Sequence, residues 1–280
     1  MRLAARIVGT EVGPIAHDID ARWLMAYAAA LGETDRRYFD TLNRNGALVA
    51  HPLFPVCYEW PAAVAARERT IPAEVYARVV HATHDLTIHR APRAGDTLLT
   101  TARIIGAVQR APGAFVVTRM ETRDAAGERV SVTDYGSLYR GVMLDGADPG
   151  TAPALDEAPV PAGALPAAGT VPVAANLAHV YTECARIWNP IHTDLAVARA
   201  AGLPDLILHG TATLALSVSR VLAACDIDVT RVRRVRCRFA GMVPMPALLE
   251  VGAQRAAKTL LFETTCAGSA VLSRGAIDLV

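Results

Sequence analysis

The chain repeats the same order of sequence features in its two halves. Tyr27 in AYAAALGETD corresponds to Tyr181 in VYTECARIWN, 154 positions later, and His51 in VAHPLF corresponds to His209 in ILHGTA, 158 positions later. A third pair of segments, TIHRAPRAGDTLL and CRFAGMVPMPALL, begins at positions 87 and 237, which is an offset of 150. Because the three offsets differ by only a few residues, we infer an internal duplication with insertions and deletions in the loops.

Each half contains a helical stretch followed by alternating segments typical of antiparallel strands. In the second half Gly210–Ala224 is apolar on nearly all sides, which predicts a helix buried on most faces. The corresponding helix of the first half is expected over Pro52–Arg69. Four strands are expected after the second helix, over residues 231–239, 247–256, 259–266 and 270–279, with Gly, Pro or Lys at the breaks. Helices followed by strands favour an α+β fold with a helix wrapped by an antiparallel sheet, twice over, and argue against a doubly wound parallel sheet.

The stretch over residues 145–172 is rich in Pro, Ala and Gly and has no apolar period, so it is predicted to be a linker. The expected division is therefore an N-terminal half over residues 1–144, the linker, and a C-terminal half over residues 173–280.

Charge and composition exclude several classes of partner. The chain has 28 basic and 27 acidic residues, so it lacks the basic excess of proteins that bind nucleic acid. The most apolar stretch, Leu206–Ala224, is interrupted by His209 and Arg220, and the N-terminus lacks the apolar core of a signal peptide. No membrane partner and a cytoplasmic location are expected.

Other common sites are missing from the sequence. The five cysteines are scattered and never spaced as CxxC, so neither a disulfide framework nor a metal site is expected. No GxGxxG or GxxxxGK[ST] pattern is present, and no cofactor is expected.

The densest group of polar residues is YTECARIWNPIHTDLAVARAAGLPDLILHG, over residues 181–210. This segment resembles the hydratase-2 motif of MaoC-like dehydratases and (R)-specific enoyl-CoA hydratases, Y-x-x-x-x-G-D-x-N-P-[IL]-H-x-D-x-x-x-A-x-x-x-G-[FL] followed by H-G. The matching residues are Tyr181, Asn189, Pro190, Ile191, His192, Asp194, Ala198, Gly202, Leu203, His209 and Gly210. The first half resembles the family's N-terminal domain over VVHATHDLTIHRAPRAGDTLLTTARI. The resemblance implies a double hotdog fold.

The chain departs from the family at its catalytic carboxylate. The family has an Asp five residues before the motif histidine, and here that position is Ile187, preceded by Arg186 where the family has Gly. In the first half, Gly32 and Glu33 fall where the Gly-Asp pair would be, but Tyr38 takes the place of the histidine. The first half therefore keeps a carboxylate without the histidine, and the second half keeps the histidine without a carboxylate.

The remaining groups suit the addition of water to an α,β-unsaturated thioester. This reaction needs a base for water, an acid for the α-carbon, and donors for the enolate-like oxygen. His192 can serve as base and acid in turn at neutral pH. Asn189 is either a turn residue or a group that orients His192 or the water. Gly210, at the start of the buried helix, either offers its N–H to the thioester oxygen or only permits close packing.

Four further residues of the motif region are expected to line the substrate site, namely Tyr181, Ile187, Trp188 and His209. Asp194 is expected to cap the following helix. Glu183 is expected to form a surface ion pair with Arg186, three residues later. Glu33 is either a charge at the end of a helix or a carboxylate that combines with the histidine of the other half.

The sequence thus favours an enzyme of the lyase class, an acyl-thioester hydratase or dehydratase. Its substrate is expected to be a thioester of coenzyme A or of acyl carrier protein, as in fatty acid or polyketide metabolism. Alternatives are an inactive acyl-thioester-binding protein and a hotdog enzyme with another thioester reaction, such as hydrolysis. The two halves already supply a pair of sheets, so a monomer or a homodimer is expected.

Overall fold

The computed structural model describes residues 1–42, 48–146 and 163–280. The chain divides into two compact units, and neither is a continuous stretch of sequence. The first unit holds Met1–His17, Tyr58–Arg90 and Thr97–Glu157, and the second holds Asp18–Cys57, Ala91–Asp96 and Ala158–Val280. Residues 18–57, although they lie in the first half of the sequence, therefore belong to the second unit. The division into sequential halves remains a description of the duplication.

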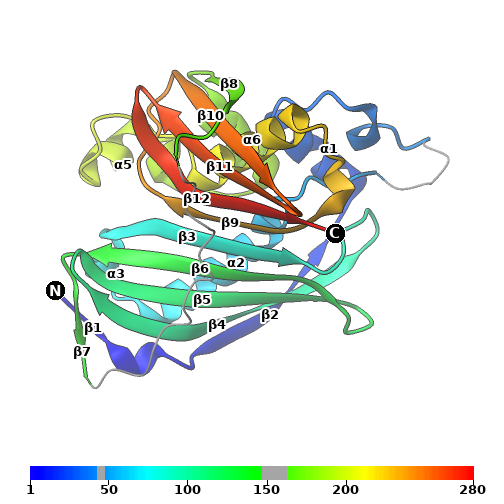
Figure 1. The fold of residues 1–280 in the computed structure, drawn as a ribbon. Coiled ribbons are helices and arrows are strands. Elements are labelled where there is room, and N and C mark those ends of the chain that lie inside the picture. The colour runs from blue at the N-terminus through cyan, green and yellow to red at the C-terminus, as the bar shows by residue number, and fades with distance from the viewer. Residues whose placement is uncertain (43–47, 147–162) are drawn as a thin grey trace. The chain divides into compact units, whose positions relative to one another are not determined.

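Each unit contributes five strands that pair one with the next, and each such set is called a sheet below (Figure 1). The strands of the first sheet are β2 (Glu11–Asp18), β3 (Val79–Ile88), β4 (Thr97–Arg110), β5 (Gly113–Asp124) and β6 (Arg129–Arg140). Those of the second are β8 (Ala167–Val173), β9 (Val232–Phe239), β10 (Ala247–Ala256), β11 (Thr259–Cys266) and β12 (Ser269–Leu279).

The two sheets have the same topology. Their strand orders are β2-β4-β5-β6-β3 and β8-β10-β11-β12-β9. Counted along each half, both orders read first, third, fourth, fifth, second. The pairs β4–β5, β5–β6 and β3–β6 of the first sheet and all four pairs of the second run antiparallel. The repeated order supports the internal duplication.

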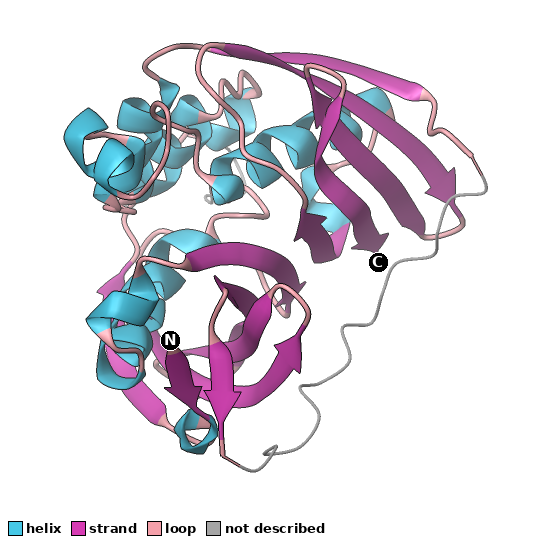
Figure 2. Cartoon of the chain, turned by 90° about the vertical axis from the view of Figure 1, so that its left-hand side faces the viewer, coloured by secondary structure: helices cyan, strands magenta, loops and turns pink. Residues whose placement is uncertain are grey.

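One long helix packs on the inner face of each sheet (Figure 2). In the first unit, Ala62 and Ala66 of α2 (Pro55–Thr70) contact Ala102 of β4 and Met120 of β5, and these small side chains bring the helix close to the strands. In the second unit, α6 (Gly210–Ala224) lies against β8, β10 and β11. The predicted α+β double hotdog architecture is confirmed. The helix α2 begins three residues later than expected.

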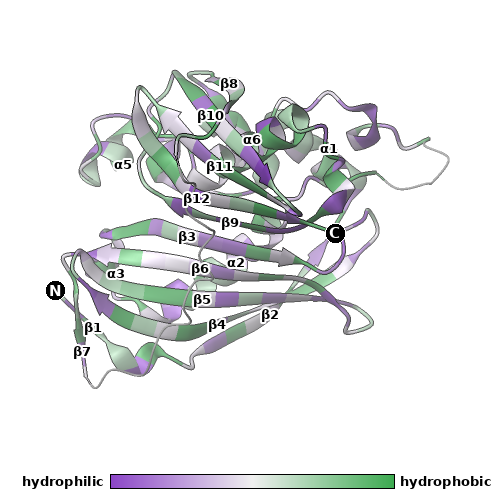
Figure 3. Cartoon of the chain, in the orientation of Figure 1, coloured by the Kyte–Doolittle hydropathy of each residue, from purple (hydrophilic) through white to green (hydrophobic). Residues whose placement is uncertain are grey.

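The alternation of side chains along the strands explains why each sheet covers its helix. On β4, Leu98, Thr100, Ala102 and Ile104 are buried, whereas the residues between them are more exposed. Figure 3 shows bands of contrasting hydropathy along the strands. One face of the sheet therefore closes over apolar atoms of the helix while the other carries polar groups.

The remaining elements are short or flank the sheets. They are β1 (Arg2–Ala4), η1 (Ala5–Ile7), α1 (Ala21–Ala30), η2 (Arg36–Tyr38), α3 (Ala73–Tyr76), β7 (Met143–Asp145), α4 (Leu177–Ala185), η3 (Pro190–His192), α5 (Leu195–Ala200) and η4 (Val229–Arg231). In the second unit α1 packs against α4. Among the described helices none is long and apolar enough to cross a membrane.

The four strands predicted in the second half agree with β9–β12 to within one residue. The predicted linker over residues 145–172 differs at its C-terminal end, because residues 167–172 belong to β8, which pairs with β10. Composition alone hides this strand, since an edge strand tolerates Pro172 and a positive φ at Gly169. Residues 147–162 of the predicted linker lie outside the described residues.

A buried carboxyl lies between α2 and the first sheet. Glu59 is 1% exposed, and its Oε1 accepts hydrogen bonds from Thr133 Oγ1 at 2.8 Å and Ser131 Oγ at 3.1 Å. Its Oε2 has no hydrogen-bond partner in the described part of the chain. Burial raises the pKa of Glu59 to about 7, although the two hydroxyl bonds oppose this.

We expect Glu59→Gln to remove a pH dependence of stability. Because the folded pKa of Glu59 lies above its unfolded value, the stability that this group contributes is fully present below about pH 4.5 and is lost as pH rises through 7. The loss is at most about 3 kcal/mol. Thermal melts from pH 5 to 8.5 should show the variant gaining Tm relative to wild type as pH rises, and parallel curves would contradict the prediction.

Candidate active site

The residues of the hydratase-2-like motif come together in the second unit. Tyr181 lies on α4, His192 ends η3, and His209 and Gly210 begin α6. Between α4 and η3 the chain makes a tight turn through residues 186–189. The motif thus brings the end of one helix, a short 3-10 turn and the start of the buried helix to one place.

The turn after α4 depends on a left-handed residue. Arg186, the C-cap of α4, has φ +58°, a conformation that glycine adopts at least cost, and the family has Gly at this position. Gly32, 154 positions earlier, has φ +72°. The guanidinium of Arg186 lies 4.0 Å from the ring centroid of Trp23 and 3.6 Å from Asp20 Oδ2. The expected ion pair between Arg186 and Glu183 is therefore wrong, because Arg186 turns toward α1.

The N-P-I-H segment forms the 3-10 turn η3. Asn189 precedes it in an extended conformation, and its carbonyl accepts the N–H of His192 at 3.1 Å, while its side chain makes no capping bond. The amide of Asn189 is therefore not used by the turn itself. Asp194 caps α5 as predicted, because its Oδ1 accepts the N–H groups of Ala196 and Val197 at 2.8 and 3.2 Å.

One hydrogen bond fixes the protonation of His192. Its Nδ1 lies 2.9 Å from the carbonyl oxygen of Ile207, which can only accept, so Nδ1 carries the proton. In the neutral ring Nε2 then holds the lone pair, and it has no hydrogen-bond partner among the described residues. His192 is 8% exposed, and burial lowers its pKa to about 4. The ring is a neutral base at physiological pH.

A second imidazole supports the first. His209 stacks on His192 with ring centroids 3.8 Å apart and planes 27° from parallel. Its Nε2 lies 3.1 Å from Thr182 Oγ1, and the residue is 2% exposed. Burial, with His192 adding to it, lowers the pKa of His209 well below its ordinary value. Two neutral rings stack without charge repulsion, and His209 holds His192 in place.

The other predicted contact residues differ in exposure. Tyr181 is fully buried, and its hydroxyl donates to Thr211 Oγ1 at 3.1 Å. Ile187 is 4% exposed, whereas Trp188 is 61% exposed. Of these three side chains, Trp188 is the one that stands at the surface, and the roles of all three in substrate binding remain predictions.

Gly210 is compatible with both of its expected roles. A Cβ at this position would lie 3.0 Å from Phe239 Cε1, so close packing alone favours glycine here. Gly210 is also the first residue of α6, where N–H groups have no partner within the helix. The positive end of the helix dipole lies at the same place, so a developing oxyanion would be stabilised there.

Two groups that orient the histidines could not be identified from the residue types in the sequence. Thr182 orients His209, but it stands at an unmarked x position of the motif. The carbonyl of Ile207 orients His192, and a backbone acceptor carries no signal in the residue type. Both groups are found only from the three-dimensional arrangement.

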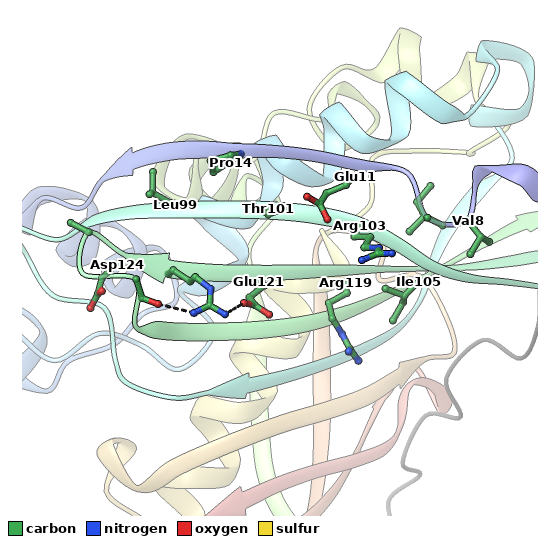
Figure 4. A pocket seen from close by; sticks show the side chains of 15 residues that line it. Val8, Glu11, Pro14, Leu99, Thr101, Arg103, Ile105, Arg119, Glu121 and Asp124 are labelled. Atoms are coloured by element: carbon green, nitrogen blue, oxygen red, sulfur yellow. Dashed lines mark hydrogen bonds and ion pairs between the residues drawn. The ribbon is translucent and has the colours of Figure 1, made fainter.

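A cavity of about 660 Å³ lies elsewhere, in the first unit on β2, β4 and β5 (Figure 4). Its lining carries several charged side chains, among them Glu11, Arg103, Arg119, Glu121, Arg123 and Asp124. None of the predicted site residues lines it. Across residues 1–42, 48–146 and 163–280, no cluster of three or more His, Cys, Asp or Glu could hold a metal ion.

Two protein families match the chain in tandem. The FAS1-like dehydratase domain region matches residues 6–133, and the MaoC like domain matches residues 161–274. A solved MaoC-like dehydratase from Phytophthora capsici superposes with a TM-score of 0.87 at 20% identity, covering 99% of this chain and 97% of that one. Residues 161–274 therefore carry a MaoC like domain, preceded by a FAS1-like dehydratase domain region, and the fold of the chain is the double hotdog of MaoC-like dehydratases.

Curated relatives are longer or match in part. The peroxisomal multifunctional enzyme type 2 of Drosophila melanogaster is 28% identical over 210 residues, which is 73% of this chain and 35% of that protein. The mouse protein of the same name is 34% identical over 96 residues, 33% of this chain and 13% of that one. The enoyl-CoA hydratase ChsH3 of Mycobacterium tuberculosis is 42% identical over 55 residues, 19% of each chain. The chain spans about a third or less of these multifunctional enzymes.

We expect His192 to titrate near pH 4 in the folded protein. In the unfolded chain the ring titrates near pH 6.5, so as pH falls the unfolded state binds a proton before the folded state does. The free energy of unfolding therefore decreases as pH drops from about 6.5 to about 4. Proton NMR of the ring Cε1–H checks this, with the resonance assigned by its loss in His192→Gln. A midpoint at or above 6.5 would show that the ring is not held neutral by burial.

Proposed function

We propose that the protein adds water reversibly to a 2-enoyl thioester of coenzyme A or of acyl carrier protein, with His192 as the acid–base group. The observation that carries this is the fixed tautomer of His192. Its Nδ1–H is committed to Ile207, so the lone pair of Nε2 is available to take a proton from water. The named relatives, which include an enoyl-CoA hydratase, support the same reaction class.

The proposed step uses three groups of the motif. Nε2 of His192 takes a proton from water as the hydroxyl bonds to C3, and the resulting imidazolium gives a proton to C2. The Gly210 N–H, at the start of α6, stabilises the thioester oxygen while it carries negative charge. Asn189, whose side chain is not used by η3, orients the water or the imidazole.

A second candidate is acyl-thioester binding without turnover, and the burial of Ile187 favours it. At 4% exposure this side chain fills the place of the family carboxylate and cannot bind or deprotonate water. A panel of 2-enoyl-CoAs of different chain length separates the two candidates. Loss of the enoyl-thioester absorbance supports hydration, whereas calorimetric binding of the same compounds without absorbance change supports the binding protein.

We expect His192→Ala to lower hydration of the best 2-enoyl-CoA by a factor of about 10² to 10⁴, because an acid–base group contributes on this scale. His84→Ala is the matched control, since His84 is a buried histidine of the first unit with a pKa lowered to about 4. It should keep most of the activity. Equal losses in both variants would point to damage to the fold instead of a role for His192.

We expect Ile187→Asp to raise activity on a short straight-chain 2-enoyl-CoA at least tenfold. The new carboxylate would stand where the family has its catalytic Asp, and Arg186 is already held by Asp20 and the ring of Trp23. Ile187→Asn is the control, because Asn is similar to Asp in size and polarity but carries no charge. If Asp slows the reaction while Asn leaves it unchanged, His192 works with another second group.

A further inference from the structure

A second polar cluster lies in the second unit, at the first-half counterpart of the motif. Glu33 is 154 positions before Ile187, and Tyr38 is 154 positions before His192. The left-handed residues that precede them, Gly32 and Arg186, share the same offset. Glu33 therefore stands at the place that the second half fills with an apolar side chain.

Helix α6 supplies the partner of this carboxyl. Ser219 Oγ donates to Glu33 Oε1 at 2.5 Å, and His51 Nε2 lies 3.0 Å from Ser219 Oγ. The direction of this chain of bonds is fixed at its far end. His51 Nδ1 accepts the N–H of Leu53 at 3.1 Å, so in the neutral ring the proton sits on Nε2. His51 donates to Ser219, and Ser219 donates to Glu33.

The direction of these hydrogen bonds excludes Ser219 as a nucleophile. A serine is activated when an imidazole lone pair accepts its proton, but the lone pair of His51 is used by Leu53. The relay instead orients Oε1 of Glu33, whereas Oε2 accepts no hydrogen bond from residues 1–42, 48–146 or 163–280 and can face a ligand. The Glu33 side chain is 19% exposed, whereas that of His51 is 1% exposed, so the carboxyl is the accessible end.

The surroundings of Glu33 suit an acid–base role. Burial raises its pKa, the bond from Ser219 lowers it, and the nearby Asp35 raises it. Asp35 is held by Arg37, and Tyr38 is a buried neutral phenol. His51 is neutral because burial lowers its pKa to about 3. The groups that face Glu33 are thus neutral or already paired.

We propose that Glu33 is the acid–base group of a second, slower site for the same hydration, positioned by Ser219 and His51. This rests on the proposed function. Oε2 of Glu33 takes a proton from water as the hydroxyl bonds to C3 and the C2=C3 electrons move toward the thioester oxygen. The protonated carboxyl then returns its proton to C2. One water is consumed and nothing is oxidised or reduced.

The slower rate follows from the residue that corresponds to Gly210 in the first half. The position equivalent to Gly210, 158 residues earlier, is Pro52, which has no N–H. The first-half site therefore lacks the donor that Gly210 offers to the thioester oxygen. A carboxylate without that donor should turn over slowly, so its activity becomes visible once His192 is removed.

The test is made in the His192→Ala background with a short 2-enoyl-CoA. The residual rate above buffer should fall at least tenfold in His192→Ala/Glu33→Gln. In His192→Ala/Ser219→Ala the acid limb of the pH–rate profile should move to higher pH, because the bond that lowers the pKa of Glu33 is gone. Ser217→Ala is the matched control, since Ser217 lies on the same helix but bonds Thr213 and Thr264.

A residual rate equal to buffer, or one that survives Glu33→Gln, would overturn the proposal, as would an unmoved acid limb. If His192→Ala is as fast as wild type while Glu33→Gln is inactive, the role of His192 fails and that of Glu33 stands. If wild type hydrates no 2-enoyl-CoA, carbon-13 NMR of labelled Glu33, assigned with Glu33→Gln, decides instead. A shift on adding butanoyl-CoA supports a thioester site at Glu33, and no shift refutes it.

Discussion

The arrangement of the site depends on the burial of helix α6. Residues 210–224 are apolar on nearly all sides, so the helix is stable only when a sheet closes around it. Burying the helix also buries the residue before it, His209, whose ring then stacks on His192. The hydrophobic effect, acting on a segment with no chemistry of its own, thereby sets the position of the group proposed to do the chemistry.

Burial also determines the charge state of the histidines. His51, His192 and His209 lie where a charged imidazolium is costly, so each is neutral. Backbone hydrogen bonds also fix which nitrogen carries the proton in His51 and in His192. The rings of His192 and His51 differ in which nitrogen carries the proton. His192 gives its Nδ1 proton to a carbonyl and keeps a lone pair on Nε2, whereas His51 accepts at Nδ1 and donates from Nε2. The two rings therefore have opposite proton polarity, although in the duplication His51 corresponds to His209 and not to His192.

Local patterns predicted the parts of the structure that local physics governs. The start of α6 at Gly210, the cap at Asp194 and the strands β9–β12 follow from periodicity and capping, which act over a few residues. The bonds from Ser219 to Glu33 and to His51 join residues 186 and 168 positions apart, and no pattern of neighbours encodes them. The strand β8 was hidden by its Pro and Gly content, because its stability comes from β10.

The division of the chain between the two units bears on how the protein is made. Residues 18–57 leave the ribosome early, yet their packing partners lie after residue 158. More than a hundred residues must be synthesised before α1 can contact α4. Until then residues 18–57 lack these packing partners, while the strands of the first sheet can already pair. Contacts of such long sequence separation slow folding. Separating the gene between the halves would leave the C-terminal product without residues 18–57, which belong to its unit.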